Sequence, residues 1–593
     1  MDSVNVTIDG RALSVPKGKT VLEAALDAGI GLPFYCYHPA LGIEGSCRVC
    51  IVKVEQMPKL QTACSTVCTE GMVVDTRSPE VTAARASVFE FLLINHPLDC
   101  PVCDKGGECP LQDYSSAYGT ATSRMDFPRR EFDGPGVKGD VDFGPTLILN
   151  RNRCILCNRC VRFMRDVDGD AQISIQDRGH GSQIQTFQEE GVHSLLSGNL
   201  ADVCPVGAIT TKDYRFVSRP WVNPTAVDTI CTLCSKGCNI QAWLRAVPEW
   251  AKAPRIARIT PRFNPDVNEY WMCDTGRFGF HFVESGDRLI QPLARNAGGD
   301  LAPVTWHDLM VQMRAALGPT ADRPRRGLRF LASAHASLEE LFLLTRLARG
   351  LHGDGPGQEV SLGWRVSEKK QPATARFVVP RVDAPNVEGA RDMGVHVKVA
   401  DTGEADLSAL RAAVDSGAAR AVYVLDPGPA GSIGEVEWLI TARRDGRIEL
   451  LVVEGILLTD LAKAADFVLP GASFLEKDGC FTNEQHLVQA ASRAVAPPGD
   501  AMEDWQILLN VSLMLGVPHT ASSATQIRAE IAAALEHRAG YANLAHIGFA
   551  RPTARRSVLQ VSNPSERVKW ESLYKDLPPV KFAAGQGPSS KQG

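Results

Sequence analysis

The chain has 593 residues, of which 44% are hydrophobic and 22% charged, and its formal net charge is −5. This length exceeds what one hydrophobic core supports, so we expect several domains. The slightly acidic balance gives no basic surface for nucleic acid, and no run of about 18 apolar residues predicts a membrane span. The first residues lack the basic-then-apolar layout of a signal peptide, which predicts a cytoplasmic chain.

The cysteines are distributed unevenly. Sixteen of the 17 lie at or before Cys273, and the remaining one is Cys480. The cytoplasm keeps thiols reduced, so grouped cysteines there favour metal ligands over disulfides. Free buried cysteines remain the alternative for one or two of them.

The N-terminal residues follow the order of elements in a β-grasp ferredoxin. Val4 to Gly10 alternates as a strand does and ends in a turn, and Arg11 to Val15 predicts a second strand. Thr20 and Glu23 predict a capped helix that ends near Gly29. Two strands and a helix followed by a cysteine loop favour a ferredoxin-type domain.

That loop contains Cys36, Cys47, Cys50 and Cys64 in the pattern C-x10-C-x2-C-x13-C. Four thiolates on two irons would form a 2Fe–2S centre. The first gap is longer than the x4 of plant-type ferredoxins, which excludes an ordinary plant ferredoxin but not this cluster type. Cys68 competes with Cys64 for the fourth position. We prefer Cys64, because Cys68 lies where the chain enters the next predicted strand.

A histidine joins three cysteines in the second group. Val81 to Asn95 predicts a helix that leads to His96, and Cys100, Cys103 and Cys109 complete the pattern H-x3-C-x2-C-x5-C. Such a set also suits zinc, but the iron–sulfur patterns around it favour a 4Fe–4S cluster. A neutral imidazole in place of a thiolate should raise the potential of that cluster.

The third group begins as C-x2-C-x2-C at Cys154, Cys157 and Cys160. We expect the fourth ligand from Cys204, which a proline follows, as is typical of 4Fe–4S sites. No second run of this kind lies near Cys204, so one cluster is expected. The region also carries four arginines, expected mainly on a solvated face, with some offsetting thiolate charge: Arg151, Arg153, Arg159 and Arg162.

Two of these stretches carry a family resemblance. Leu93 to Cys109, and the run RCILCNRCVRF from Arg153 to Phe163, resemble the large iron–sulfur subunit of NADH–quinone oxidoreductase, respiratory complex I. The first module also occurs in iron-only hydrogenases and in some NAD-linked formate dehydrogenases and hydrogenases. Iron-only hydrogenases carry two complete ferredoxin motifs in the second region, which counts against them here.

The fourth group consists of Cys231, Cys234 and Cys238, spaced C-x2-C-x3-C, with Cys273 as the fourth ligand of a 4Fe–4S cluster. It resembles the 4Fe–4S domain at the head of molybdopterin oxidoreductases and the matching domain of bacterial complex I large subunits. Mitochondrial relatives lack these four cysteines, so the resemblance implies a bacterial form. We expect the proline-rich stretch from Pro248 to Pro261 to be a loop insertion between strands.

The second half of the chain predicts a parallel α/β sheet. Gly327 to Ala332, Arg420 to Leu425 and Leu450 to Val453 read as buried strands, and Ser337 to Arg349 reads as a helix. Phe474 to Glu484 resembles a signature of the molybdopterin oxidoreductase family.

A working molybdenum site is not expected there. No cysteine lies between residues 275 and 450 to bind the metal, although relatives that bind it through serine exist, and the segment after Cys273 is short for a pterin-binding catalytic subunit. Cys480 stands where the family commonly has threonine, and Gln485-His486 replaces a Gly-Arg pair. We therefore expect a structural relic without molybdopterin.

The fold class is α+β with several domains. They are a β-grasp 2Fe–2S ferredoxin domain, a 4Fe–4S domain with one histidine and three cysteine ligands, ferredoxin-like and molybdopterin-oxidoreductase-type 4Fe–4S domains, and a shortened α/β molybdopterin-oxidoreductase-like domain. The tail should be disordered. The expected boundaries are 1–80, 81–120, 140–225, 226–285 and 286–570, followed by a tail at 571–593.

The resemblance implies an electron-transfer subunit in the NADH dehydrogenase module of complex I, a proton-translocating oxidoreductase. It would carry one 2Fe–2S and three 4Fe–4S clusters, and no complete active site. Single electrons would pass from flavin, reduced by NADH in a partner subunit, towards quinone. Other peripheral-arm subunits are implied as partners, with the chain on the cytoplasmic side of a bacterial inner membrane, attached through the complex. In this family the fourth cluster lies off the main path.

Two rival functions remain. An iron–sulfur subunit of a soluble NAD-linked formate dehydrogenase or hydrogenase would require molybdenum or a hydrogenase partner. A zinc-stabilised scaffold would be colourless.

Overall fold

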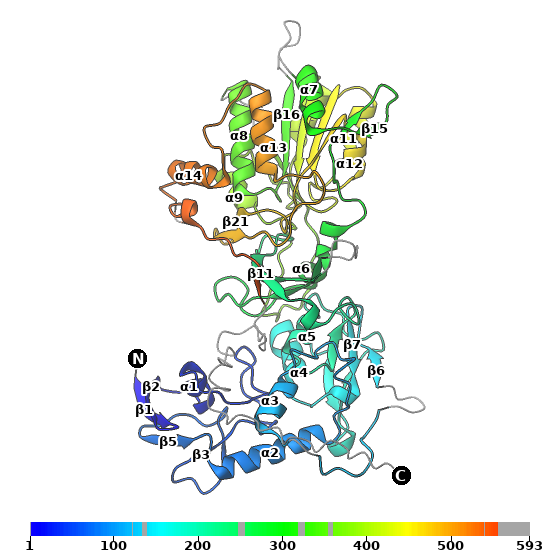
Figure 1. Cartoon of the computed structure of the whole chain (residues 1–593). Helices are drawn as coiled ribbons and strands as arrows, with labels where there is room; N and C mark the ends of the chain where they lie inside the picture. The colour runs from blue at the N-terminus through cyan, green and yellow to red at the C-terminus, as the bar shows by residue number, and fades with distance from the viewer. Residues whose placement is uncertain are drawn as a thin grey trace, which may run out of the picture.

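The computed structural model describes residues 2–120, 123–132, 139–246, 255–317, 327–353, 360–538 and 540–554. Figure 1 shows two lobes joined by a narrower waist: N-terminal elements in blue and cyan form the lower lobe, and green to orange elements form the upper lobe. The predicted tail at 571–593 lies outside the described residues. Within them, no helix combines the length and the apolar character needed to cross a bilayer.

The N-terminal hairpin and helix form as predicted. Thr20 Oγ1 accepts a hydrogen bond from Glu23 N–H at 3.3 Å, and the Glu23 carboxylate accepts one from Thr20 N–H at 2.9 Å, which completes a capping box. The helix packs on a mixed sheet of order β2-β1-β5-β3-β4, in which β1 and β5 are parallel. The elements are β1 (Ser3–Ile8), β2 (Arg11–Pro16), α1 (Val21–Asp27), β3 (Ile51–Val54), β4 (Gln61–Thr62) and β5 (Met72–Asp75).

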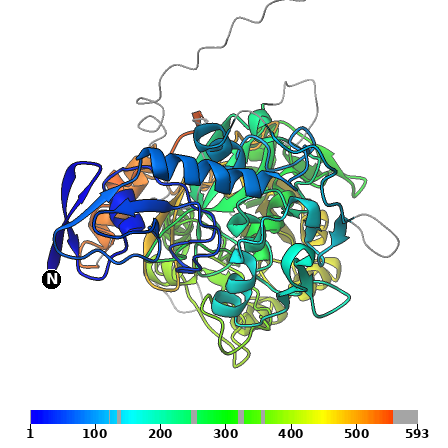
Figure 2. The ribbon, with the colours of Figure 1, turned by 90° about the horizontal axis from the view of Figure 1, so that it is seen from below.

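A long helix follows this sheet. α2 (Pro79–Leu93) begins two residues before the predicted start, because Ser78 caps it and Pro79 fits the first turn. Seen from below in Figure 2, α2 lies across the underside of the lower lobe. Short strands and helices fill the rest of this lobe: α3 (Pro110–Tyr118), β6 (Asp140–Asp142), β7 (Leu147–Asn150), α4 (Arg159–Phe163), β8 (Ile173–Gln176), β9 (Gln183–Thr186), α5 (Asn199–Val203) and β10 (Ile209–Thr211).

The waist is an antiparallel sheet of order β13-β12-β11-β23. The predicted loop over Pro248–Pro261 is wrong in its second half, where Ile256–Pro261 forms β13 and buries Ile256 and Ile259. Residues 247–254 lie outside the described part of the chain. The elements are β11 (Thr225–Ile230), β12 (Asn239–Leu244), β13 (Ile256–Pro261), α6 (Asp274–Phe278) and β23 (Thr553–Ala554).

The upper lobe is built on a sheet of order β15-β14-β20-β19-β18-β16-β17, in which the last five strands are parallel, as predicted. Helices lie on both sides of it in Figure 1. The strands are β14 (Leu293–Arg295), β15 (Leu301–Pro303), β16 (Leu328–Ser333), β17 (Ser361–Gly363), β18 (Ala421–Asp426), β19 (Leu450–Gly455), β20 (Phe467–Pro470) and the separate hairpin β21 (Gly479–Thr482) and β22 (Val488–Ala491). The helices are α7 (Trp306–Leu317), α8 (Leu338–His352), α9 (Val387–Asp392), α10 (Ser408–Asp415), α11 (Glu437–Arg444), α12 (Asp460–Ala464), α13 (Asp504–Met514) and α14 (Ala524–Ala534).

Candidate metal centres

The first cysteine group converges in the loop that covers the N-terminal sheet. Hydrogen bonds with the thiols of Cys47 and Cys64 lower the pKa of Cys36, and hydrogen bonding to Cys36 and then Cys50 raises the pKa of Cys64. Cys36 therefore lies within hydrogen-bonding reach of Cys47 and Cys64, and Cys64 within reach of Cys50. Cys68 is also buried, but its charged neighbours are Glu23 and Lys19 rather than these thiols.

The second group lines one cavity of about 350 Å³, to which His96, Cys100, Cys103 and Cys109 all contribute. Among the described residues, His96 Nδ1 is buried and has no hydrogen-bond partner. Burial lowers the pKa of His96 to about 4, which keeps the imidazole neutral. An unpaired, neutral ring nitrogen among three cysteines fits a metal ligand.

The loop between these cysteines needs its glycine. A Cβ on Gly106 would come within 2.7 Å of the Cys100 carbonyl oxygen, so any side chain there would displace the ligand loop. Cys109 stands at the N-terminus of α3. Burial raises its pKa to about 12, while the N–H groups of Gln112 and Leu111 act in the opposite direction by donating to the sulfur.

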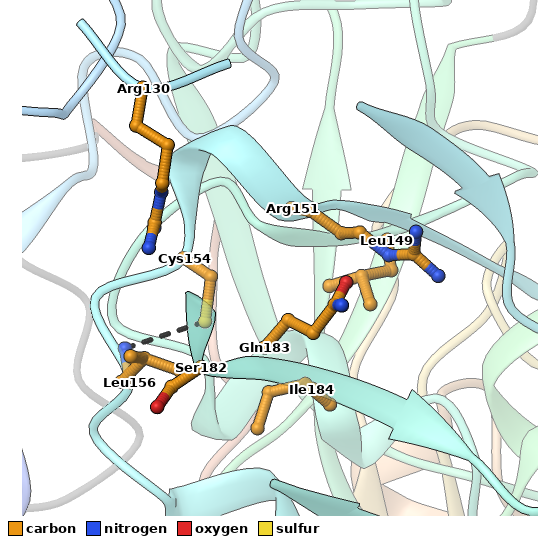
Figure 3. Close-up of a pocket in the computed structure, with 8 residues that line it drawn as sticks. All are labelled: Arg130, Leu149, Arg151, Cys154, Leu156, Ser182, Gln183 and Ile184. Atoms are coloured by element: carbon orange, nitrogen blue, oxygen red, sulfur yellow. Dashed lines mark hydrogen bonds between the residues drawn. The ribbon is translucent and has the colours of Figure 1, made fainter. Parts of the chain in front are cut away.

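The third group also surrounds a single small cavity, lined by Cys154, Cys157, Cys160 and Cys204. Burial raises the pKa of Cys154 to about 12 and that of Cys157 to about 11. Figure 3 shows the Leu156 N–H directed at Cys154 Sγ, at 3.4 Å. The same view shows the Arg130 side chain pointing toward Cys154.

The fourth group lies at the waist. Cys231, Cys234 and Cys238 occupy the turn between β11 and β12, and Cys273 caps α6. Burial raises the pKa of Cys231 to about 12, and the thiols of this group interact electrostatically with one another. Gly276 N–H lies 3.4 Å from Cys273 Sγ.

All four arrangements fit iron–sulfur clusters better than free thiols. A buried thiolate costs free energy unless positive charge stabilises it, and bound metal deprotonates a coordinating thiol. Within the described residues, no three His, Cys, Asp or Glu side chains converge as ligands of one metal ion do. The ligands of a multi-iron cluster are spread over several irons, one ligand per iron in 4Fe–4S and two per iron in 2Fe–2S, so the whole set stands further apart.

The first three groups adjoin one another. A Cβ on Gly207, three residues after Cys204, would collide with Cys103 Sγ. Cys109 Sγ lies 3.9 Å from the Pro205 carbonyl oxygen. Tyr35, beside Cys36, is fully buried and donates from its hydroxyl to the Pro110 carbonyl at 3.3 Å.

The expectation of a solvated arginine face is wrong for three of the four arginines. Arg153, Arg159 and Arg162 are buried, whereas Arg151 is half-buried. Arg153 Nε donates to Asp99 Oδ2 at 2.9 Å, between the second and third groups. The partners of these side chains lie far away in the sequence, so local pattern could not reveal them.

Sequence reasoning missed a set of buried charges in the upper lobe. Lys477 Nζ lies 2.6 Å from Glu340 Oε1 and 2.8 Å from Asp504 Oδ2, and all three are buried. Burial raises the pKa of Asp426, at the end of β18, to about 7. Lys477 belongs to the family signature at 474–484, which was the available signal. Cys480 is buried on β21, and its N–H donates to Glu339 at 3.0 Å.

Comparison with protein families matches five regions of the chain. Two of the matched families are domains of NADH–quinone oxidoreductase, one is a 2Fe–2S domain, and two belong to molybdopterin oxidoreductases. They are the 2Fe-2S iron-sulfur cluster binding domain (1–79), the NADH-ubiquinone oxidoreductase-G iron-sulfur binding region (85–124), the ferredoxin-like domain of NADH-quinone oxidoreductase subunit 3 (144–210), the molybdopterin oxidoreductase Fe4S4 domain (224–285) and molybdopterin oxidoreductase (386–513).

Individual relatives extend this result. The G subunit of NADH-quinone oxidoreductase from Streptomyces coelicolor is 42% identical over 59% of this chain and 40% of its own length, so the match spans less than half of that protein. The mitochondrial 78 kDa subunit of NADH-ubiquinone oxidoreductase from Candida albicans is 33% identical over 86% of this chain and 82% of its own length. A solved NAD+-reducing [NiFe]-hydrogenase is 32% identical, with a TM-score of 0.33 over 37% of this chain and 91% of that one.

The fold and the matched domains define an iron–sulfur protein with 2Fe–2S and 4Fe–4S domains followed by a molybdopterin-oxidoreductase-type domain. The match to the Candida subunit extends over most of both chains, which identifies the family. The chain belongs to the family of the large iron–sulfur subunit of the NADH–quinone oxidoreductase complex, called the G subunit in bacteria and the 78 kDa subunit in mitochondria.

Proposed function

We propose that this chain is the electron-transfer subunit of the NADH dehydrogenase module of respiratory complex I. It relays single electrons from flavin, reduced by NADH in a partner subunit, towards quinone. The contiguity of the first three cysteine groups carries this proposal. Cys36 of the first group lies in the same hydrophobic core as thiols of the second and third groups, and short inter-site distances are what electron relay requires.

Each group is assigned one cluster. The assignment gives one 2Fe–2S and three 4Fe–4S clusters, which supply one-electron chemistry when bound. The ligand sets are Cys36, Cys47, Cys50 and Cys64 for the 2Fe–2S cluster; His96, Cys100, Cys103 and Cys109 for the first 4Fe–4S cluster; Cys154, Cys157, Cys160 and Cys204 for the second; and Cys231, Cys234, Cys238 and Cys273 for the third.

The protein's own contribution is burial, hydrogen bonding and charge. Backbone N–H groups such as those of Leu156 and Gly276 donate to ligand sulfurs and stabilise the more negative, reduced state. Buried arginines add positive charge beside the third group. Apolar side chains in the same core exclude water from the relay.

The finer features of the fold belong to the same proposal. The domains are placed at 1–80 (β-grasp), 81–120, 140–225, 226–285 and 286–570, the last being a shortened relic without molybdopterin. The buried Lys477 triad fills the interior beside α8 and α13 with the chain's own side chains, which supports a structural role.

The partners would be the flavin- and NADH-binding subunit and other subunits of the peripheral arm. The chain would then lie on the cytoplasmic side of a bacterial inner membrane and associate with it through the complex. Family membership supports these placements.

The proposal is tested in the assembled complex by freeze-quench EPR after mixing with NADH. Reduction of the clusters in this chain within the turnover time is the expected result, and clusters that stay oxidised would contradict it. Molybdenum analysis of the same sample separates the rival function, since stoichiometric molybdenum would favour a formate dehydrogenase subunit.

A further inference from the structure

We propose that Arg162 ties the first cysteine group to the third and sets the reduction potentials of both. The inference rests on the proposed function, because it concerns the clusters that these groups would hold. Arg162 is the side chain that links the first and third sites.

Arg162 reaches from one ligand segment into the other. It lies on α4, two residues after Cys160, and its side chain is only 2% exposed. Nη1 donates to the Leu41 carbonyl at 2.9 Å and to the Gly42 carbonyl at 3.0 Å, and Nη2 donates to the Cys36 carbonyl. One guanidinium thus holds three backbone carbonyls of the first loop.

Neighbouring side chains reinforce the same junction. Asn158 Nδ2 donates to Glu44 Oε1 at 2.9 Å, and Glu44 Oε2 lies 3.4 Å from Arg162 Nε. Arg159 donates to the Tyr37 carbonyl and, at 3.4 Å, to the Val203 carbonyl beside Cys204. Three side chains from the ligand segment of the third group therefore form hydrogen bonds with the loop of the first group.

This placement has an electrostatic consequence. The charge of Arg162 acts on both Cys36 and Cys157, which belong to different groups. Backbone carbonyls orient the guanidinium without cancelling its charge, and the carboxylate that opposes it, Glu44, is partly exposed to solvent. A fixed positive charge in a poorly solvated site stabilises the reduced, more negative state of any cluster beside it, and so raises the potential.

The geometry also distinguishes arginine from lysine. A planar guanidinium presents several donors in a fixed fork, whereas an ammonium is a point charge that cannot reach three carbonyls at once. R162K should therefore keep most of the electrostatic effect and lose the clamping effect. R162Q should lose both.

The test is an EPR-monitored redox titration of the cluster-loaded full chain. In R162Q we expect the first and third clusters to shift to lower potential, with the ratio of reduced to oxidised cluster falling about tenfold at a fixed potential, or about 59 mV for one electron. The second and fourth clusters should not move. R165Q is the matched control, because Arg165 lies further along the same segment but is exposed and paired with Asp166.

E44Q provides an independent test, because it should shift the reduction potentials in the opposite direction. Removing the carboxylate that faces Arg162 should raise the potentials of the first and third clusters, and R162K should leave them close to those of the unaltered chain. Unchanged potentials in R162Q, or lowered potentials in E44Q, would overturn the inference. Absence of cluster signals from the unaltered chain would instead overturn the proposed function.

Discussion

The two lobes differ in the polar groups that cluster in their interiors. In the lower lobe and waist, thiols from the second, third and fourth groups belong to one extended core, together with Cys36 of the first. In the upper lobe, the core consists of aliphatic and aromatic side chains around a parallel sheet, and buried charges pair with one another there, as Lys477 does with Glu340 and Asp504. The grouped thiols face other thiols, whereas the ion triad contains both signs of charge.

This difference indicates which parts of the chain depend on a cofactor for their stability. A parallel sheet covered by helices on both faces buries enough apolar surface to be stable on its own. Apart from the N-terminal sheet and α2, the lower lobe consists of short strands, short helices and loops around cysteines, so we expect cluster binding to supply part of its folding free energy.

Removing the clusters should produce the largest difference in stability between the two lobes. After iron chelation we expect backbone amides between residues 36 and 285 to lose hydrogen-exchange protection by about 100-fold or more, while β16, β18 and β19 keep theirs. Hydrogen exchange with mass spectrometry measures both in one sample. Equal protection of the two lobes before and after chelation would show that the lower lobe folds without iron.

Breaking the ion triad should damage only the upper lobe. In Lys477→Met, Glu340 and Asp504 lose their shared cation while buried, which should cost about 3–5 kcal/mol of unfolding free energy. Urea dependence of exchange in β18 and β19 measures this, and the EPR signals of the clusters should be unchanged.

The matched control for that variant is Lys463→Met. Lys463 forms an exposed pair with Asp460, at 3.0 Å, so its loss should change stability by no more than about 0.5 kcal/mol. If Lys477→Met lowered the unfolding free energy as little as this control, the triad would not contribute to the stability of the upper lobe.

The convergence of Cys154, Cys157 and Cys160 around one cavity was predictable because their spacing is local in the sequence. The strands β16, β18 and β19 were predictable for the same reason, since each is a short buried run of apolar residues. The burial of Arg162 was not, because its acceptors lie about 120 residues away at Leu41 and Gly42.

The upper-lobe charges were missed for a similar reason. Lys477, Glu340 and Asp504 come from three separate segments, and each alone resembles an exposed residue. The position of Lys477 within the family signature at 474–484 was the available local sign. The strand β13 was missed because prolines flank it and because its buried isoleucines, Ile256 and Ile259, are three residues apart and break the alternation typical of a strand.

His96 offers a smaller, single-site test within the lower lobe. His96→Cys should lower the potential of the second cluster by about 100 mV, because a thiolate adds negative charge where a neutral imidazole stood. A redox titration followed by EPR measures the shift, and the other three clusters serve as internal references. An unmoved potential would remove the proposed role of this histidine while leaving the cluster count intact.

The smallest expected effect concerns pH and the upper lobe. The pKa of Asp426 is raised to about 7 by burial, so the folded state retains a proton that the unfolded state releases near pH 4. Its stabilising contribution is therefore complete below about pH 4 and is lost as the pH rises to about 7.

Asp426→Asn should abolish the loss of stability at high pH, because the amide stays neutral. The variant should be more stable than the unaltered chain by about 1–2 kcal/mol at pH 8 and nearly equal to it at pH 4. Exchange in β18 at the two pH values measures the difference. A variant that is less stable at both would show that Asp426 is ionised in the folded protein.

The assignment predicts four clusters in one chain, and the iron content of the purified chain tests that number. Iron and acid-labile sulfide are measured on the purified full chain, together with EPR of the reduced protein at several temperatures. We predict about 14 iron atoms per chain, with one 2Fe–2S signal and the remaining signals from 4Fe–4S clusters. Zinc in place of iron, or an iron count that accounts for only one or two clusters, would contradict the assignment.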